Sequence, residues 1–260
     1  MEISEIKKIT PYQDINDVIV LFLEELKKYL GDNLMGLYLT GSLSYGDFVR
    51  ERSDIDFEAI VKNPLSSEEL ELVKALHIKI ENKYKEWAER IECSYLPVNL
   101  LPEIMPPKIP RPWWGSGVFY PEALYGNEWI INQYQLYNFG ITLFGPDYKI
   151  ISKPIDIKEV QKACVGDLFQ EWELKIRDSK WLENSHYQSY LVLNLCRILY
   201  TVLCGEVGSK KVSAEWAKNE YPEWKKLIEI AENWRYGIEM KEKEKAIELV
   251  KFTMDKVRWE

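Results

Sequence analysis

The feature that most constrains this chain is a pair of short motifs separated by a brief stretch of sequence. Gly41-Ser42 closes the apolar run 37–40, and Ser53-Asp54-Ile55-Asp56 opens a second apolar run. Two strands joined through a glycine-bearing turn place both motifs at one edge of a sheet. Because alternate side chains of a strand share a face, we expect the two aspartates to point one way and the isoleucine between them to point into the interior.

This pair of aspartates predicts a metal site. Two carboxylates held side by side repel each other and resist joint ionisation, and a divalent cation removes that penalty. Aspartate is also disfavoured within strands, so Asp54 and Asp56 need a reason to be there. The pattern therefore predicts a magnesium-dependent site that handles phosphate. The alternative is an ordinary pair of surface carboxylates on an edge strand.

The Gly41-Ser42 turn is a candidate phosphate-binding element. Glycine lets the backbone approach a phosphate closely, and a short helix expected over 43–48 offers free N–H groups at its start. The Ser42 hydroxyl could bond a terminal phosphate oxygen. Taken alone, the dipeptide is more often a plain turn.

A third strand is expected from Ile91 to Leu101, with Glu92 and Ser94 on one face. If it lies beside the second strand, Glu92 adds a third carboxylate. Three converging carboxylates are typical of a two-metal phosphoryl-transfer site. Alternatively, Glu92 is the general base that takes a proton from an attacking hydroxyl. Glu58 shares the parity of the aspartates, and we expect it to be a solvated charge.

Composition narrows the class of protein. The chain has 260 residues, of which 46% are hydrophobic and 29% charged, so it is globular rather than disordered. A net charge of −8 disfavours nucleic acid as the main partner and suits a cationic one. Two histidines and four cysteines without Cys-x-x-Cys spacing argue against structural zinc. With no signal peptide or long apolar span, a cytoplasmic protein without a membrane segment is expected.

Periodicity divides the chain into an α/β half and a helical half. The first half reads as helix 12–30, strands 35–40 and 55–61, a helix from about 66 to 90, and the third strand. Five prolines between 102 and 112 then predict neither helix nor central strand. Beyond them, helices are expected at 121–139, 157–179, 186–205, 211–219, 222–235 and 241–258.

The expected fold class is α+β: a small mixed β-sheet domain with helices, followed by an all-α helical-bundle domain. The predicted domains are residues 1–105, which carry the Gly41-Ser42 and Asp54/Asp56 motifs, and residues 121–260, which are helical. Residues 106–120, rich in proline and tryptophan, are expected to connect them. A monomer or a homodimer is expected.

Taken together, the motifs resemble the signature of the nucleotidyltransferase superfamily, which pairs a Gly-Ser turn with an Asp-x-Asp metal site and a third strand carboxylate. The helical half is similar to that of aminoglycoside adenylyltransferases, in particular the group that modifies streptomycin and spectinomycin. The residues that carry both resemblances are Gly41-Ser42, Gly46, 53–57, 143–146, 195–200, Gly205, 210–212 and 214–217.

The resemblance implies roles for individual residues. Mg²⁺, with two ions expected, and ATP as co-substrate would bind at Asp54, Asp56 and Glu92. Arg197 and Lys210 match the family's phosphate-binding arginine and lysine, and Ile91-Glu92-Cys93-Ser94 matches the strand entry that bears its catalytic base. The nucleotide-binding set is completed by Gly41, Ser42 and Ser53.

The segment that contacts the acceptor departs from the family pattern. Residues 178–187 lack the Gly-Asp-Glu run found there, and Trp181 and Glu183 are the candidates to replace it. Asp178 is a further candidate, as an acidic residue that would attract a cationic acceptor. Trp113 is a further candidate, as a stacking wall for a sugar ring, with ordinary packing as the alternative.

The most favoured function is transfer of AMP from ATP to a hydroxyl of a small cationic acceptor, an aminoglycoside or aminocyclitol antibiotic, which would confer antibiotic resistance. One alternative is a regulator that adenylylates a protein, as antitoxin-like enzymes of this superfamily do. The other is a nucleotide-binding module that has lost catalysis.

Overall fold

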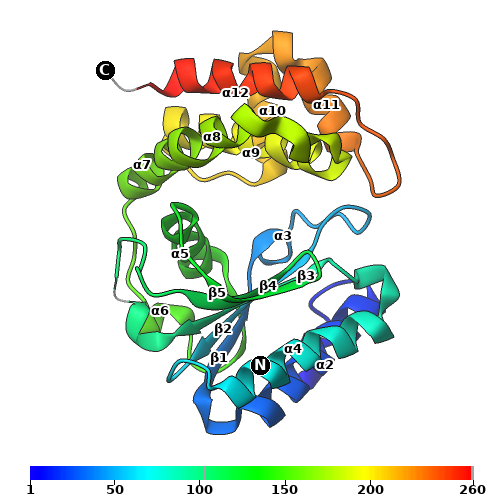
Figure 1. Cartoon of the computed structure of the whole chain (residues 1–260), viewed down its shortest axis with the longest axis vertical. Coiled ribbons are helices and arrows are strands. Elements are labelled where there is room, and N and C mark those ends of the chain that lie inside the picture. Colours follow the sequence, from blue (N-terminus) through cyan, green and yellow to red (C-terminus); the bar gives the residue numbers. More distant parts are fainter. Residues whose placement is uncertain (102, 259–260) are drawn as a thin grey trace. The chain divides into compact units, whose positions relative to one another are not determined.

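The computed structural model describes residues 1–101 and 103–258. Contacts divide the chain into two compact units (Figure 1). Unit 1 consists of Met1–Phe48, Ser53–Tyr125 and Asn132–Pro154, and unit 2 of Val49–Arg52, Gly126–Ile131 and Ile155–Glu260. A sheet with helices thus precedes a helical unit, and the expected α+β fold class is confirmed.

Unit 1 is built on a six-stranded mixed sheet in the order β5-β4-β3-β2-β1-β6. The pair β2–β3 is parallel, and the other neighbours are antiparallel. The strands are β1 (Leu34–Leu39), β2 (Ile55–Val61), β3 (Ile91–Pro97), β4 (Arg111–Gly115), β5 (Val118–Ala123) and β6 (Ile141–Phe144).

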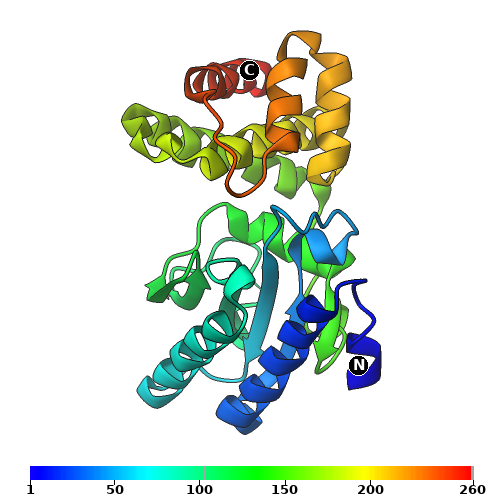
Figure 2. The ribbon, with the colours of Figure 1, turned by 90° about the vertical axis from the view of Figure 1, so that its right-hand side faces the viewer.

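Two long helices, α2 (Gln13–Leu30) and α4 (Ser67–Lys83), lie side by side against one face of this sheet (Figure 2). A capping box starts α4, where the Ser66 hydroxyl accepts from the Glu69 amide and the Glu69 carboxylate accepts from the Ser66 amide. The shorter helices of this part are α1 (Ile3–Ile6), α3 (Gly41–Ser44) and α6 (Tyr148–Ile151), and α5 (Glu128–Phe139) belongs to it from Asn132 onward.

The core of unit 1 fills the space between these helices and the sheet. Phe22 of α2 stacks on Phe57 of β2 with ring centroids 4.3 Å apart, and Ile55 is fully buried. The prediction that Ile55 points inward is therefore confirmed, and Phe57 points the same way. Because side chains alternate along a strand, Asp56 lies on the face that α2 and α4 do not cover.

The proline-dense segment differs from expectation, because it leads into an inner strand. In β4, Trp113 pairs with Ser94 of β3 on one side and with Tyr120 of β5 on the other. Pro112 falls where the register between β4 and β5 shifts, so its missing N–H breaks no paired position. The helix expected from residue 121 starts only at Glu128, because β5 occupies the preceding residues.

Strand β6 is a second difference. No strand is expected between the predicted helices 121–139 and 157–179, but Ile141 and Thr142 pair with Leu39 and Tyr38 of β1. A four-residue strand carries too little alternation to be recognised locally. Pairing with β1, which the local sequence cannot reveal, holds these residues in a strand.

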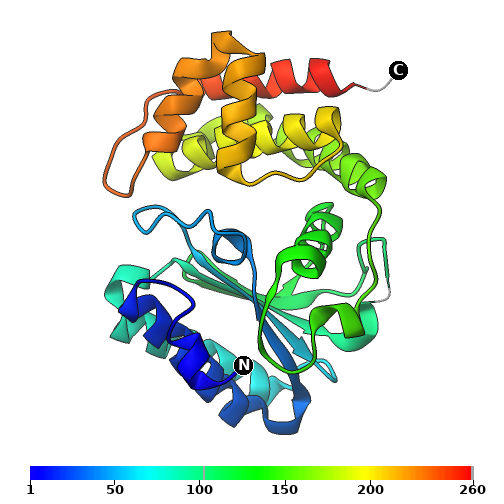
Figure 3. The ribbon, with the colours of Figure 1, turned by 180° about the vertical axis from the view of Figure 1, so that it is seen from behind.

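Unit 2 is a helical bundle around α9 (Figure 3). In the described residues, the longer helices of this unit are α7 (Ile157–Asp167), α9 (Ser185–Cys204), α10 (Lys210–Glu220), α11 (Lys225–Asn233) and α12 (Lys243–Val257), and α9 packs against each of the others. Between α7 and α9 the expected single helix 157–179 is broken into a π-helical turn, the three-residue α8 (Glu173–Lys175) and a 3₁₀ segment with a kink at Asp178.

The four cysteines are free thiols. Cys93, Cys164 and Cys196 are buried, and Cys204 is exposed. Throughout the described ranges, no helix is long and apolar enough to cross a membrane.

Candidate functional site

The turn after β1 brings the two sequence motifs together. Gly41 has φ +61°, and a Cβ placed on it would lie 1.9 Å from Oδ2 of Asp56. The Thr40 amide donates to the Asp56 carbonyl at 3.0 Å. Glycine is needed here for two reasons, because the backbone is left-handed and because the Asp56 carboxylate occupies the space of a side chain.

The helix after the turn is shorter than the sequence predicts. It spans Gly41–Ser44, and the Asp47 amide then donates to the Ser42 carbonyl at 3.0 Å. The Ser44 hydroxyl donates to the Gly41 carbonyl at 2.8 Å. A helix of four residues has only a small macrodipole. Any affinity of Ser42 for an anion therefore comes from its half-buried hydroxyl and the amides around it.

Asp56 and Glu92 are direct neighbours on adjacent strands. They are registered partners in the parallel pair β2–β3, flanked by the pairs Ile55–Ile91 and Phe57–Cys93. The flanking side chains are buried, whereas Asp56 and Glu92 are half-buried on the opposite face. Neighbouring strands lie about 4.8 Å apart, so the two carboxyl groups share one small region of the sheet.

Arg90 was not predicted, although it contacts two residues of the metal motif. Its side chain is 7% exposed, its Nη2 donates to the Ser53 carbonyl, and its Nε lies 3.8 Å from Oδ1 of Asp54. The guanidinium lies over the ring of Trp87 at 4.4 Å. At the end of a predicted helix an arginine is ordinarily a surface residue, so the sequence carries no signal for this contact.

Glu58 is buried, and the expectation of a solvated charge is wrong. Burial raises its pKa to about 7, opposed by the charge of Arg111 and a hydrogen bond with Ser94. Arg111 in turn donates from Nε to the Ser94 hydroxyl at 3.1 Å and from Nη1 to the Leu124 carbonyl at 2.8 Å. Glu58, Ser94 and Arg111 therefore form a polar cluster. It lies on the same face of the sheet as Asp56 and Glu92 and extends toward β4.

The two neighbouring tryptophans of β4 have different surroundings. Trp113 is half-buried, stacks on Tyr120 at 5.2 Å and is registered with Ser94, so it lies on the face of Asp56 and Glu92. Trp114 lies on the other face, where it stacks on His77 at 4.6 Å and donates to Glu81 at 2.9 Å. Only Trp113 remains a candidate for contact with a ligand on the Asp56 face.

Two basic candidates come from unit 2. Arg197 of α9 is half-buried, and its side chain forms no hydrogen bond or ion pair with the residues that the structure describes. Its charge opposes the rise that burial causes in the pKa of the Cys164 thiol. Lys210 opens α10, with its Nζ 4.9 Å from the ring centroid of Tyr190.

The three acceptor candidates around residue 180 differ in their surroundings. Trp181 packs near Trp172 at 5.8 Å, and its Nε1 donates to the Lys175 carbonyl at 3.0 Å. Glu183 is exposed and pairs with Lys243 at 2.5 Å. Asp178 is exposed at the kink of the 3₁₀ segment.

The chemistry of the carboxylates suits magnesium carried by a nucleotide. In the described part of the chain, no group of three or more His, Cys, Asp or Glu is arranged to hold a metal ion by itself. Magnesium commonly binds through one or two carboxylates, water and substrate phosphates rather than in an all-protein cage. One or two of the carboxylates of Asp54, Asp56 and Glu92 would fit that mode.

Comparison with known proteins agrees with this architecture. Residues 153–258 match the family model "Aminoglycoside adenylyltransferase, C-terminal domain". Spectinomycin 9-adenylyltransferase of Staphylococcus aureus is 27% identical over 219 residues, which cover 80% of each chain. The protein of the same name from Campylobacter jejuni is 28% identical over 220 residues, covering 81% of this chain and 80% of that one.

A solved structure extends the likeness to the fold. Spectinomycin adenyltransferase AAD(9) from Enterococcus faecialis, crystallised with ATP and spectinomycin, superposes with a TM-score of 0.74 at 20% identity and covers 93% of this chain and 98% of that one. The expected resemblance of this chain to the aminoglycoside adenylyltransferases is therefore confirmed, by sequence over about 80% of its length and by fold over 93% of it.

Proposed function

We propose that this chain transfers AMP from ATP to a hydroxyl of a small aminocyclitol or aminoglycoside, with spectinomycin as the first acceptor to test. The single observation that carries the proposal is the packing of the Asp56 carboxylate against Gly41, beside the registered Glu92. The names of the sequence relatives support the choice of acceptor. A reaction that consumes ATP is expected in the cytoplasm, where buried thiols such as Cys93 also stay reduced.

Glu92 is proposed as the general base. It is half-buried near the start of β3 and adjacent to Asp56 on β2. In this role it accepts the proton of the acceptor hydroxyl, whose oxygen attacks the α-phosphorus of ATP in line. The new phosphorus–oxygen bond forms as the bond to the β-phosphate breaks, and pyrophosphate leaves.

Asp54 and Asp56 are proposed to hold Mg²⁺ together with the triphosphate, and Glu92 is a further ligand if it is not the base. When bound, the ion neutralises charge on the phosphates. The role of the protein is to keep the carboxylates in place. Arg90 does so for Asp54, because it contacts both its carboxylate and the preceding carbonyl, and Gly41 does so for Asp56.

Ser42, Ser53, Arg197 and Lys210 are proposed to bind the phosphates. The strongest support concerns Arg197, a half-buried guanidinium without an ion pair among the described residues. A partly buried cation without a carboxylate partner favours an anionic ligand. For Ser42 the support is its place next to Gly41, and for Lys210 it is the family resemblance.

Trp113 is proposed to stack against the acceptor, because it lies on the face of Asp56 with Tyr120 against it. Trp181, Glu183 and Asp178 are retained as acceptor contacts on the basis of sequence position. The two acids are exposed and would attract a cationic drug.

The test is a pyrophosphate-release assay with Mg-ATP and separate spectinomycin, streptomycin and kanamycin arms, plus an arm without acceptor. We expect release with spectinomycin, and a mass gain of one AMP on the drug. Glu92→Gln, which keeps the shape of the side chain and removes its basicity, should abolish both. Absence of pyrophosphate with every acceptor would contradict the proposal.

A further inference from the structure

The connection between α3 and β2 has an unusual place in the fold. Residues 45–54 form no helix or strand, and they join the Gly41 turn to Asp54 and Asp56. Four of these residues, Val49–Arg52, group by contacts with unit 2, whereas Phe48 and Ser53 on either side group with unit 1. Val49–Arg52 therefore take part in the contacts of unit 2.

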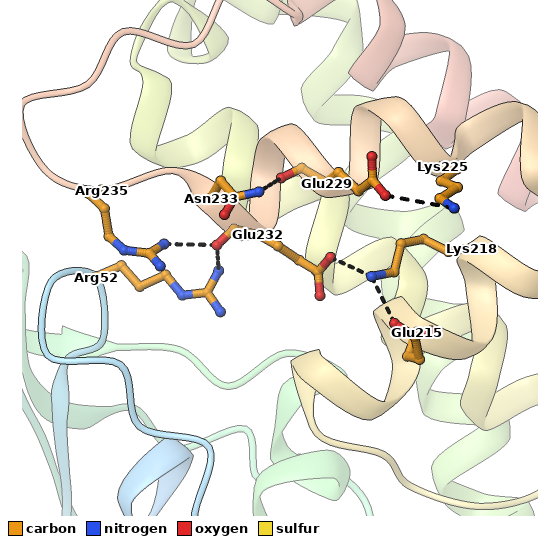
Figure 4. A network of polar contacts seen from close by, with 8 residues as sticks. All are labelled: Arg52, Glu215, Lys218, Lys225, Glu229, Glu232, Asn233 and Arg235. Carbon is orange, nitrogen blue, oxygen red and sulfur yellow. Dashed lines mark hydrogen bonds and ion pairs between the residues drawn. The ribbon is translucent and has the colours of Figure 1, made fainter.

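Arg52 makes one of these contacts through its side chain. Its Nη1 donates to the Glu232 carbonyl at 2.8 Å (Figure 4). The neighbouring Glu51 carbonyl accepts from the Tyr236 amide at 3.4 Å, and the Arg52 amide closes a turn onto the Val49 carbonyl at 3.0 Å. The four residues are thus held by both side-chain and backbone bonds.

The Glu232 carbonyl is a good acceptor for a guanidinium. It belongs to the last turn of α11, where carbonyls lack intrahelical partners and the helix dipole is negative. Hydrogen bonds from a charged donor are stronger than neutral ones. Arg235 donates to the same carbonyl at 2.8 Å and to the Trp234 carbonyl at 2.7 Å, so two arginines cap this helix end.

The acceptor is itself well fixed. The Glu232 carboxylate pairs with Lys218 of α10 at 2.9 Å, and Lys218 pairs with Glu215 at 2.8 Å (Figure 4). Hydrogen bonds with Glu215 and Glu232 raise the pKa of Lys218 to about 12, so the lysine stays charged. Arg52 therefore binds a carbonyl that α10 and α11 hold in place.

We propose that Arg52 is a positioning residue for the nucleotide reaction: by binding the end of α11 it orders the connection that leads into Ser53 and Asp54. The inference rests on the proposed function. Ordering a backbone in advance lowers the entropy lost when a ligand binds it. Loss of the Arg52 bond should therefore raise KM for Mg-ATP more than it lowers kcat.

The matched control for Arg52 is Arg235. It donates to the same Glu232 carbonyl but does not belong to the connection 45–54. In Arg52→Ala we expect about a tenfold rise in KM for ATP, the size typical of one charged hydrogen bond. Arg235→Ala should change KM less than threefold, and Arg52→Lys, which keeps a cationic donor, should recover part of the loss. Equal effects of Arg52→Ala and Arg235→Ala would mean that Arg52 acts only as a cap of α11, and the inference would be overturned.

Hydrogen exchange of the free protein gives a readout that needs no turnover. We expect faster amide exchange across 41–54 in Arg52→Ala, with α10 and α11 as protected as in the parent. In Arg235→Ala, exchange across 41–54 should stay unchanged. Unchanged exchange in Arg52→Ala would refute the inference even if the parent is active. If the parent releases no pyrophosphate, the proposed function fails while the exchange comparison still decides whether Arg52 orders this connection.

Discussion

Gly41→Ala is the substitution whose effect follows most directly from the geometry. A Cβ at this position would lie 1.9 Å from Oδ2 of Asp56, whereas real Cβ contacts essentially never fall below 3.0 Å. The carboxylate must therefore move by 3.0 − 1.9, or about 1.1 Å. A misplacement of about 1 Å costs roughly 100-fold in rate in enzymes. The left-handed backbone at φ +61° adds about 1–2 kcal/mol of strain for a residue with a side chain.

The chain offers a matched control in Gly46. It has φ +74°, but nothing lies within 4 Å of its added Cβ. We expect Gly46→Ala to lose a similar 1–2 kcal/mol of folding free energy while it retains pyrophosphate release within a few-fold. Gly41→Ala should lose comparable stability and about 100-fold in kcat/KM.

The assay combines urea unfolding with spectinomycin-dependent pyrophosphate release. Equal losses of activity in both variants would show that backbone strain, rather than displacement of Asp56, causes the defect. Full activity in Gly41→Ala would refute the reasoning, because the carboxylate could then move without consequence.

Three further predictions concern side chains around the sheet. Arg90→Met should weaken Mg-ATP binding about tenfold, because Asp54 loses a charged partner; calorimetric titration measures this, and unchanged affinity would count against it. Burial lowers the pKa of His77 to about 3, so the unfolded state alone takes up a proton below its ordinary pKa of about 6.5. The stability that the neutral ring contributes is complete above that pH and falls by about 1.4 kcal/mol per unit as pH decreases toward 3. Relative to His77→Phe, which cannot titrate, urea unfolding of the parent should show no slope above about pH 7 and this slope below about pH 6; parallel curves throughout would refute it. Trp113→Ala should raise KM for the acceptor and leave KM for ATP unchanged, whereas equal rises in both would indicate a general packing defect.

The parts of the fold that were predictable have strong local patterns. β2 follows its expected span because an alternating apolar run begins directly after Asp54, and α4 starts at its capping box. The predicted face of Glu92 on β3 is also correct. Side chains alternate along a strand regardless of which strand lies beside it. Local periodicity thus identified the strands that carry the candidate carboxylates.

The parts of the fold and site that were not predicted depend on contacts with residues far along the chain. β4 was excluded because of its prolines, yet a register shift at Pro112 accommodates one inside the sheet. No motif singles out Arg90 or Arg111, and only the fold shows that both are buried against polar groups of the candidate site. Glu58 was assigned to solvent for the same reason, since a charge gives no local sign of burial.

The measurement that tests the central claim most directly is spectinomycin-dependent pyrophosphate release by Asp56→Asn. Its control is Asp32→Asn, which removes the same charge from an exposed position. If Asp56 holds the ion that accompanies ATP, Asp56→Asn loses at least about 100-fold in kcat/KM, as expected for a group that acts on the transition state. Asp32→Asn stays within twofold. Activity of Asp56→Asn equal to that of Asp32→Asn would contradict the account.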